Sequence, residues 1–174
     1  MLKPKFKITF LIVCLIYLIF ATVSIASCAT PNLKYTKSVS IKTANGAFVC
    51  AKDGGGSEIN ASCGSPQGFT VIGNLVYGGP IALQTFDGKH YVSAKNGGGD
   101  GLNAESTTIG NDEIFKVMGP NLKSDGSPVN IGDNIVFQTF DGKHFICAVF
   151  GGQHELTADR LMPQEWETFT FQAI

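Results

Sequence analysis

After about residue 30 the chain is a succession of short apolar runs separated by turn-forming residues, with no sustained helical periodicity. The clearest block predicts four strands, at Ile81–Thr85, His90–Ala94, Leu102–Glu105 and Ile114–Met118. The turn Asp87-Gly88 between the first two is a strong hairpin signal, because glycine takes a positive φ without steric cost. Gly97 to Gly99 then allow the chain to reverse toward the third strand. The pattern predicts an all-β domain.

The same block recurs later in the chain. Residues 81–117 align with residues 135–171 at a constant offset of 54, without a gap. The residues from Gln84 to His90 recur unchanged from Gln138 to His144. Self-similarity at a fixed period indicates one structural unit that is used several times.

A more diverged copy precedes these two. Thr43-Ala44-Asn45-Gly46 aligns with the turn of the second copy, and Gly54-Gly55-Gly56 aligns with its glycine run. We therefore predict three repeats, at about 38–78, 79–122 and 132–174. Twelve short strands in equal units favour a closed or nearly closed barrel with pseudo-threefold symmetry, because closure limits exposed strand edges. The predicted core positions are Ile41, Phe48, Ile59, Phe69, Leu83, Tyr91, Leu102, Phe115, Phe137, Phe145, Leu156 and Phe169.

The order of these motifs resembles the fascin-like β-trefoil. An apolar strand precedes Asn/Asp-Gly-Lys, then come an aromatic residue, an alanine, Gly-Gly, Leu-x-Ala and Trp/Glu-x-Phe. The last copy keeps the order best and ends in Trp166-Glu167-Thr168-Phe169. The resemblance covers residues 38–174 and implies a β-trefoil of three pseudo-symmetric four-stranded repeats. It implies the fold more strongly than an activity, because one fold can carry many functions.

The first 28 residues carry a separate message. A short basic start precedes an apolar run from Ile8 to Ala26, an order that is typical of an export signal. The run ends in Ile25-Ala26-Ser27-Cys28, which resembles the bacterial lipobox. That resemblance implies a signal peptide at residues 1–27, a lipid on Cys28, and a tether at residues 28–37.

Two alternatives to lipidation stay open. The apolar run is close to the roughly 20 residues that span a bilayer, so it can also be an uncleaved anchor helix. Ordinary cleavage after Ala29 is the other alternative. All three export the domain, either to the cell envelope as a membrane-anchored lipoprotein or, if it is cleaved without lipidation, into the medium.

The exported part is weakly acidic. Without Lys3, Lys5 and Lys7 of the leader, 10 basic residues stand against 14 acidic ones. Nucleic-acid recognition needs a basic face, so we expect no nucleic-acid partner.

Export also bears on the cysteines, since an oxidising compartment permits disulfides. Cys50 and Cys63 lie on strands that we expect to pair, which makes them the candidate disulfide. Cys147 would then be a free cysteine. Three small buried thiols are the alternative.

Nothing in the sequence predicts catalysis, a cofactor or a metal site. The acidic residues are scattered over loops without a close repeated pair, and no Gly-x-Ser-x-Gly elbow is present. Cys147 fills the repeat position of Ser93 and Cys50, so packing explains it without a nucleophilic role. His90 and His144 lie on different thirds of the barrel, whereas a metal needs converging ligands. We expect a protein that is not an enzyme.

Carbohydrate binding is the activity with the best chemical basis. Ligand sites combine apolar or aromatic surface with a few placed polar groups. The candidate ligand-binding residues are Asp87, Lys89 and His90 in one turn, Asp141, Lys143 and His144 in the equivalent turn, and Trp166 as an aromatic platform. The Asp-Gly turns are also required by the hairpins themselves, so the fold alone can explain them.

The alternatives are a protein-interaction module and a purely structural surface lipoprotein. The fascin-like resemblance implies actin as a partner. An exported, lipid-anchored chain would meet actin rarely, so we rank actin below a glycan or a surface protein.

Overall fold

The computed structural model describes residues 36–174. The first strand begins at Thr36, slightly before the predicted boundary at Ser38. The predicted signal peptide or anchor helix, the lipidation of Cys28 and most of the tether at residues 28–37 lie outside the described residues. Within residues 36–174, the structure has no helix whose length and apolarity would suit it to cross a bilayer.

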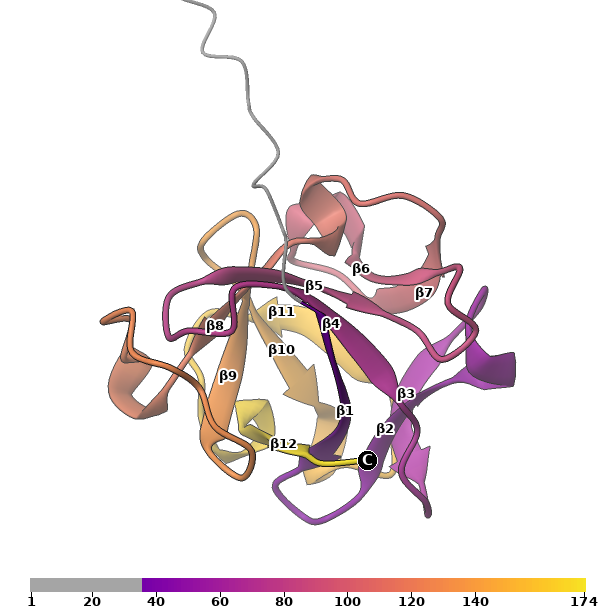
Figure 1. Ribbon diagram of the computed structural model, residues 1–174, viewed down its shortest axis with the longest axis horizontal. Helices are drawn as coiled ribbons and strands as arrows, with labels where there is room; N and C mark the ends of the chain where they lie inside the picture. The colour runs from indigo at the N-terminus through magenta and orange to yellow at the C-terminus, as the bar shows by residue number, and fades with distance from the viewer. Residues whose placement is uncertain (1–35) are drawn as a thin grey trace, which may run out of the picture. The chain divides into compact units, whose positions relative to one another are not determined.

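Strands dominate the domain, in three successive groups of four (Figure 1). The first group is β1 (Thr36–Thr43), β2 (Phe48–Ala51), β3 (Ile59–Cys63) and β4 (Phe69–Gly73). The second is β5 (Pro80–Gln84), β6 (Tyr91–Ala94), β7 (Leu102–Ser106) and β8 (Phe115–Met118). The third is β9 (Asn134–Thr139), β10 (Phe145–Ala148), β11 (Leu156–Arg160) and β12 (Phe169–Gln172). The described helices are single 3-10 turns: η1 (Lys52–Gly54), η2 (Lys95–Gly97), η3 (Asn111–Glu113), η4 (Pro120–Leu122), η5 (Val149–Gly151) and η6 (Glu165–Glu167).

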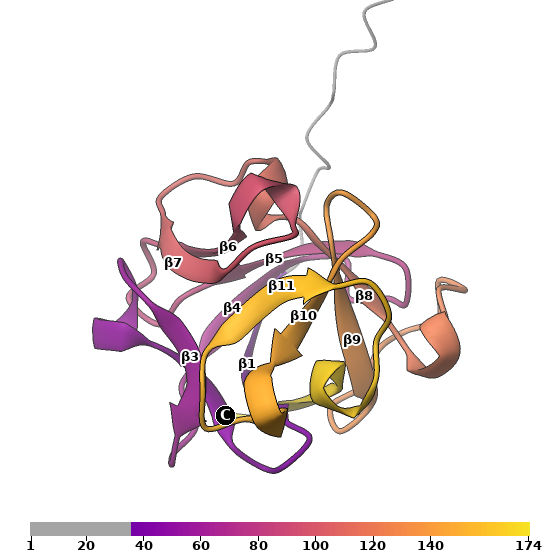
Figure 2. The same cartoon turned by 180° about the vertical axis from the view of Figure 1, so that it is seen from behind.

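The first and fourth strands of each group pair with one another to form a closed six-stranded barrel. β1 pairs with β4, β4 with β5, β5 with β8, β8 with β9, β9 with β12, and β12 with β1, always antiparallel. The middle strands of each group form the hairpins β2–β3, β6–β7 and β10–β11, the last two of which are seen best from behind (Figure 2). A barrel closed by three hairpins is the β-trefoil, as the sequence predicted.

The core repeats the threefold pattern. Phe69, Phe115 and Phe169 begin the fourth strand of each repeat and are at most 1% exposed. Ile41, Leu83 and Phe137 stand at equivalent positions in the first strands and are also buried. Full burial of such a side chain contributes about 1.5–3 kcal/mol, so this symmetric core is the main source of stability.

The predicted core is wrong at one position in each of the first two repeats, where Phe48 and Tyr91 are only partly buried. Phe145, at the equivalent position of the third repeat, is buried as predicted, in a smaller cluster with Met118 and Val136. The next residue along each strand fills the core instead: Val49, Val92 and Ile146. Neighbouring residues of a strand face opposite sides of the sheet. The smaller residue of each pair therefore faces the interior of the barrel, where the three repeats pack closely together.

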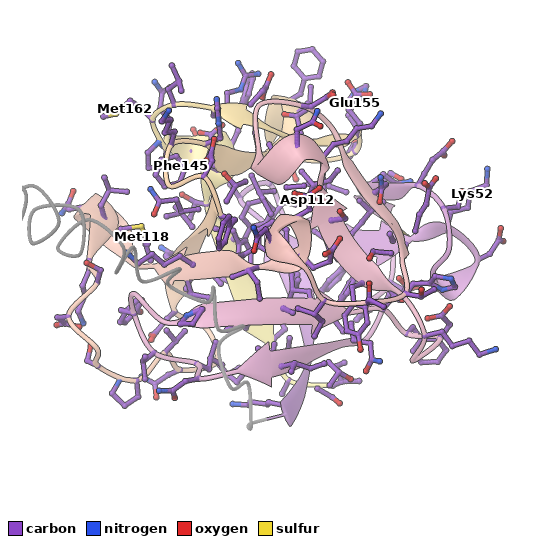
Figure 3. All side chains as sticks on the ribbon, turned by 90° about the horizontal axis from the view of Figure 1, so that it is seen from above. Lys52, Asp112, Met118, Phe145, Glu155 and Met162 are labelled. Carbon is purple, nitrogen blue, oxygen red and sulfur yellow. A yellow bond between two sulfur atoms is a disulfide. The ribbon has the colours of Figure 1, made fainter. Side chains whose placement is uncertain are left out.

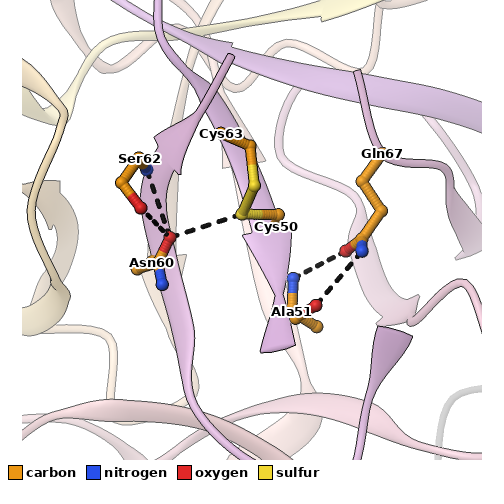
Figure 4. Close-up of a disulfide and its surroundings, with 6 residues drawn as sticks. All are labelled: Cys50, Ala51, Asn60, Ser62, Cys63 and Gln67. Atoms are coloured by element: carbon orange, nitrogen blue, oxygen red, sulfur yellow. Dashed lines mark hydrogen bonds between the residues drawn. A yellow bond between two sulfur atoms is a disulfide. The ribbon is translucent and has the colours of Figure 1, made fainter. Parts of the chain in front are cut away.

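A disulfide joins Cys50 to Cys63 across the first hairpin (Figure 4). These are the two cysteines that the sequence made the candidate pair. Gln67 lies beside this hairpin, where its side chain accepts from Ala51 N at 2.6 Å and donates to Ala51 O at 3.1 Å. Cys147 is a free, buried thiol, and burial, aided by Glu167, raises its pKa to about 11. It is therefore protonated and inert at neutral pH.

Candidate functional site

The aspartate of each predicted binding turn organises its own backbone. Asp87 Oδ1 accepts hydrogen bonds from Thr85 Oγ1 at 2.8 Å, from Lys89 N at 2.9 Å and from His90 N at 3.2 Å. Its Oδ2 pairs with Nδ1 of His90. The third repeat reproduces this network around Asp141, with Thr139, Lys143 and His144 as partners.

These hydrogen bonds shift the titration of both carboxyl groups. Burial alone would raise the pKa of Asp87, but the bonds from Lys89 N, the His90 ring and Thr85 hold it well below its ordinary value. The same balance lowers the pKa of Asp141. Both side chains are ionised at neutral pH and already engaged within the protein.

Each of these turns also packs against the glycine run of the preceding repeat. Asp87 N donates to Gly54 O at 3.1 Å, and Asp141 N donates to Gly97 O at 3.2 Å. The third repeat closes the circle on the first, because Asn45 N donates to Gly151 O at 3.4 Å. We call the packing of the glycine run of one repeat against the first turn of the next repeat the inter-repeat contact.

The inter-repeat contact leaves no room for a side chain on the glycine. A Cβ atom on Gly55 would lie 2.5 Å from Thr85 Oγ1, and one on Gly98 would lie 2.6 Å from Thr139 Oγ1. On Gly152 it would lie 2.7 Å from Thr43 Oγ1. Besides the role in their own hairpins that the sequence indicated, the predicted binding turns thus also join neighbouring repeats.

The remaining predicted residues are placed differently. Lys89 and Lys143 are exposed, and neither forms a side-chain hydrogen bond or ion pair with the rest of the described domain. The two turns belong to different thirds of the barrel and do not combine into one site. Trp166 lies in η6 of the third repeat, away from the tip of either turn in sequence, and has other neighbours.

Those neighbours form a cluster of exposed aromatic rings. The ring of Phe150 lies edge-on to Trp166, with centroids 5.6 Å apart, and edge-on to His154 at 5.0 Å. Phe150 is 63% exposed and Trp166 is 40% exposed, although both are large and apolar. We call Phe150, His154 and Trp166 the aromatic cluster.

A hollow of about 410 Å³ adjoins the cluster. It is lined by Arg160, Met162, Gln164, Glu165, Trp166 and Glu167. Met162 and its neighbour Leu161 are also strongly exposed, and Met162 lies at the outer edge of the third repeat (Figure 3). Polar groups and apolar surface therefore meet beside one indole ring.

A buried carboxylate fixes the turn that carries Trp166. Glu167 is 3% exposed, and its Oε2 accepts from Gln164 N at 2.7 Å. Glu113 does the same for Gly110 N in the second repeat, also at 2.7 Å. Arg160 Nε lies 3.9 Å from Glu167 Oε1, which balances part of the buried charge. The indole thus stands on a rigid support.

The repeats differ sharply at the positions of the aromatic cluster. By the offset of 54, Phe150 corresponds to Asn96, His154 to Asp100 and Trp166 to Asp112. The first repeat has Asp53, Ser57 and Pro66 at these places. Since two repeats fold with small or polar residues here, the fold does not require the aromatic rings.

Phe150 is also held in an unfavourable conformation. Its φ is +56°, and the equivalent Asn96 and Asp53 have φ of +58° and +55°. Asparagine and aspartate tolerate this left-handed region, whereas a bulky residue there costs on the order of 1–3 kcal/mol. Such outliers occur preferentially at ligand sites.

A second hollow, of about 770 Å³, lies where the three hairpins meet. Isolated bridges join them pairwise around the pseudo-threefold axis: Glu58 with Asn103, Asn60 with Glu155, and Gly101 with Thr157. We call this space the axial hollow. Its lining includes four carboxylates, which are Glu58, Asp100, Glu155 and Asp159.

No three His, Cys, Asp or Glu side chains converge on a possible metal position anywhere in residues 36–174. Of the site as a whole, the sequence pointed to Trp166 but missed Phe150, His154 and Met162. A position-by-position comparison of the three repeats would have found them, since only the third has aromatic or large apolar residues there.

Comparisons with known proteins bear on the fold. No family model matches the chain, and no curated protein matches it. Among solved structures, it is similar to ThreeFoil, a designed 3-fold symmetric protein, with a TM-score of 0.58 and 10% identity over 79% of this chain and 99% of that chain. The SDF2-like protein from Arabidopsis thaliana matches with a TM-score of 0.60 and 11% identity, over 80% and 93% of the two chains. A mutant of interleukin-1 beta from gallus matches with a TM-score of 0.57 and 14% identity, over 81% and 98%.

These similarities establish the β-trefoil fold. At such low identity they carry no activity over to this chain. The fascin-like assignment stays a prediction from the sequence motifs.

Proposed function

We propose that the protein is a non-catalytic binding module that holds a carbohydrate on the aromatic cluster of its third repeat. One observation carries the proposal: two repeats fold with polar or small residues where the third exposes Phe150, His154 and Trp166. Residues that packing does not need, one of them held in a costly conformation, are best explained by a ligand.

The chemistry of the site suits a sugar. The apolar C–H face of a sugar ring packs on an aromatic face, while its hydroxyl groups need hydrogen-bonding partners at the rim. Trp166 offers the face, and Gln164, Glu165 and Arg160 line the same hollow with both donors and acceptors.

A surface-protein partner is the second candidate. Leu161 and Met162 extend the exposed apolar surface beyond the size of one sugar ring, as is typical of protein interfaces. The experiment below separates the two ligands.

We propose the location of the module from the sequence of its leader. A lipid on Cys28 would anchor the domain at the cell envelope, and cleavage without lipidation would release it. The Cys50–Cys63 disulfide supports an oxidising, exported location. The mass of the mature protein from membranes, compared with Cys28→Ala, tests this: acylation that the variant lacks supports the anchor, and an unmodified chain in the medium contradicts it.

The binding proposal is tested by a glycan array followed by calorimetric titration of each hit. Trp166→Asp and Phe150→Asn install the residues of the second repeat, which the fold accepts, and Phe86→Ala removes an exposed ring elsewhere. We expect each site variant to weaken binding about five-fold or more, because stacking on one ring contributes about 1 kcal/mol or more. The control should bind as the parent does.

Two outcomes would count against the proposal. No binding on the array at millimolar glycan would contradict the carbohydrate proposal. Capture of an envelope protein by the parent but not by Trp166→Asp would then support the second candidate. Glycan binding that both site variants retain would place the site elsewhere.

A further inference from the structure

The axial hollow and the aromatic cluster share one residue, His154. His154 lines the axial hollow, and its ring also lies against Phe150, which in turn contacts Trp166. Trp166 lines the smaller hollow, of about 410 Å³. A ligand longer than one sugar unit can therefore lie over the aromatic rings and reach the axial hollow at one end.

The walls of the axial hollow are set by the backbone. The bridges Glu58–Asn103, Asn60–Glu155 and Gly101–Thr157 join all three repeats around it. Ala61 N and Ala158 N add bonds to His154 O and Asp100 O, both at 2.8 Å. The hollow thus belongs to the rigid barrel end and not to a single loop.

The charge of the axial hollow has one sign. Neither lysine nor arginine lines it, while Glu58, Asp100, Glu155 and Asp159 do. Three of these have a partner: Lys52 Nζ lies 3.9 Å from Glu58, Gly101 N donates to Asp100 at 2.8 Å, and Thr157 Oγ1 donates to Asp159 at 2.8 Å. Glu155 forms no side-chain hydrogen bond or ion pair with the described residues.

The cations that pair with carboxylates of the hollow do not reverse its charge. Lys52 and Arg160 are both about half exposed, and Arg160 already contacts Asp159 at 3.6 Å and Glu167 at 3.9 Å. Carboxylates accept hydrogen bonds only, and aromatic faces attract cations. An ammonium group meets both conditions, whereas a carboxylate or sulfate group on the ligand would be repelled.

We infer that the ligand is an oligosaccharide that bears a free amino group, held with one ring on the aromatic cluster and its ammonium-bearing unit in the axial hollow. The inference rests on the proposed function and names its substrate class. Cationic amino sugars are favoured over their acetylated and neutral counterparts.

A matched series of ligands tests the inference. The probes are tetramers of β-1,4-linked glucosamine, N-acetylglucosamine and glucose, which differ at one substituent of each ring. They are titrated calorimetrically into the full chain at low and at moderate salt. The parent is compared with the double variant Asp100→Asn/Glu155→Gln, with Trp166→Asp, and with Glu105→Gln, an exposed carboxylate outside the hollow.

We expect the glucosamine tetramer to bind about ten-fold more tightly than the other two and to lose this advantage as salt rises. The double variant should lose the preference but keep the weaker binding that all three tetramers share. Glu105→Gln should leave both unchanged, and Trp166→Asp should weaken the two neutral tetramers.

The outcomes distinguish the two proposals. Equal binding of the three tetramers, or a preference that the double variant keeps, would overturn the amino-sugar inference and leave the proposed function standing. Binding of the two neutral tetramers that Trp166→Asp does not weaken would overturn the proposed function, because the indole would then not hold the sugar. No binding of any tetramer would contradict the inference, while the glycan array would still decide the proposed function.

Discussion

At the scale of single residues, Asp87 and Asp141 show how one side chain can organise a turn. Each accepts from a threonine hydroxyl and two backbone N–H groups and pairs with a histidine. Asn45 holds the equivalent place in the first repeat, where its Oδ1 accepts from Thr43 Oγ1 at 2.9 Å. The turn therefore tolerates an uncharged amide but gains from a carboxylate.

We predict that this gain depends on pH. Both carboxyls have a pKa below the unfolded value near 4, so their contribution is complete at neutral pH and is lost as the pH falls through the lowered native pKa. The free energy of unfolding of the parent should thus decrease between about pH 5 and pH 2.

The variant Asp87→Asn/Asp141→Asn should be less stable at pH 7 by about 1–3 kcal/mol and should depend less on pH over the acid range. Urea denaturation at several pH values measures both quantities, with Glu105→Gln as the control. An identical pH slope in parent and double variant would show that these carboxyls do not carry the effect.

At the scale of elements, the inter-repeat contact explains why a glycine run follows the second strand of each repeat (β2, β6 and β10). Gly98 has φ of +132°, and a Cβ atom there would meet Thr139 Oγ1 at 2.6 Å and Asp141 at 3.2 Å. A side chain would thus be strained twice, by the backbone and by the neighbouring repeat.

We predict that Gly98→Ala lowers the free energy of unfolding by about 2–4 kcal/mol. Gly64→Ala is the matched control, since a Cβ atom there would have no neighbour within 4 Å and its φ lies outside the left-handed region. It should change stability by less than about 0.5 kcal/mol. Equal effects of the two substitutions in thermal or urea unfolding would refute the role of the contact.

The first hairpin is also held by its disulfide. Cys50 and Cys63 are 13 residues apart, and closing a loop of this length stabilises a domain by about 2–3 kcal/mol. We predict that the variant Cys50→Ala/Cys63→Ala loses this amount, and that reductant destabilises the parent but not the variant.

Alkylation followed by peptide mapping should leave Cys147 unlabelled until the domain unfolds, because its thiol is buried.

At the scale of the whole molecule, internal repetition made the fold predictable. In the second repeat, whose pattern aligns without a gap with residues 135–171, every predicted strand end lies within one residue of the observed one. The predicted burial of Phe48 and Tyr91 was wrong, because neighbouring strand residues face opposite sides and Val49 and Val92 take the inner position. Both neighbours are apolar in each strand, so the hydrophobic pattern does not decide between them.

The candidate site was less predictable for a different reason. Trp166 is the single tryptophan and was recognised as a possible platform. Phe150 lies sixteen residues earlier in a different loop, and only the folded hairpin brings the two rings together. The contact of Asp87 with Gly54 was not predicted for the same reason, since Gly54 belongs to another repeat.

The inter-repeat contacts form a closed circle, which leads to a prediction about the chain as a whole. Ser40, in the middle of β1, pairs with Gln172 at the end of β12, so Ile174 lies within a few residues of Thr36 and a short linker can join them. New ends between the exposed Thr107 and Thr108 would leave all three contacts intact. We predict that this permuted domain unfolds cooperatively, within about 2 kcal/mol of the parent. Loss of a cooperative transition, measured by circular dichroism during denaturation, would show that the original chain order matters.

The pseudo-threefold equivalence of the aromatic cluster finally sets the valency of the domain. The positions of Phe150 and Trp166 exist three times, but only the third pair is aromatic. Asn96 already has the backbone conformation of Phe150, and η3 has the same buried-glutamate support as η6. Asn96→Phe with Asp112→Trp would therefore build a second platform without changing the scaffold. A domain with two such platforms would hold a repetitive polysaccharide by avidity, at a strength that neither platform reaches alone.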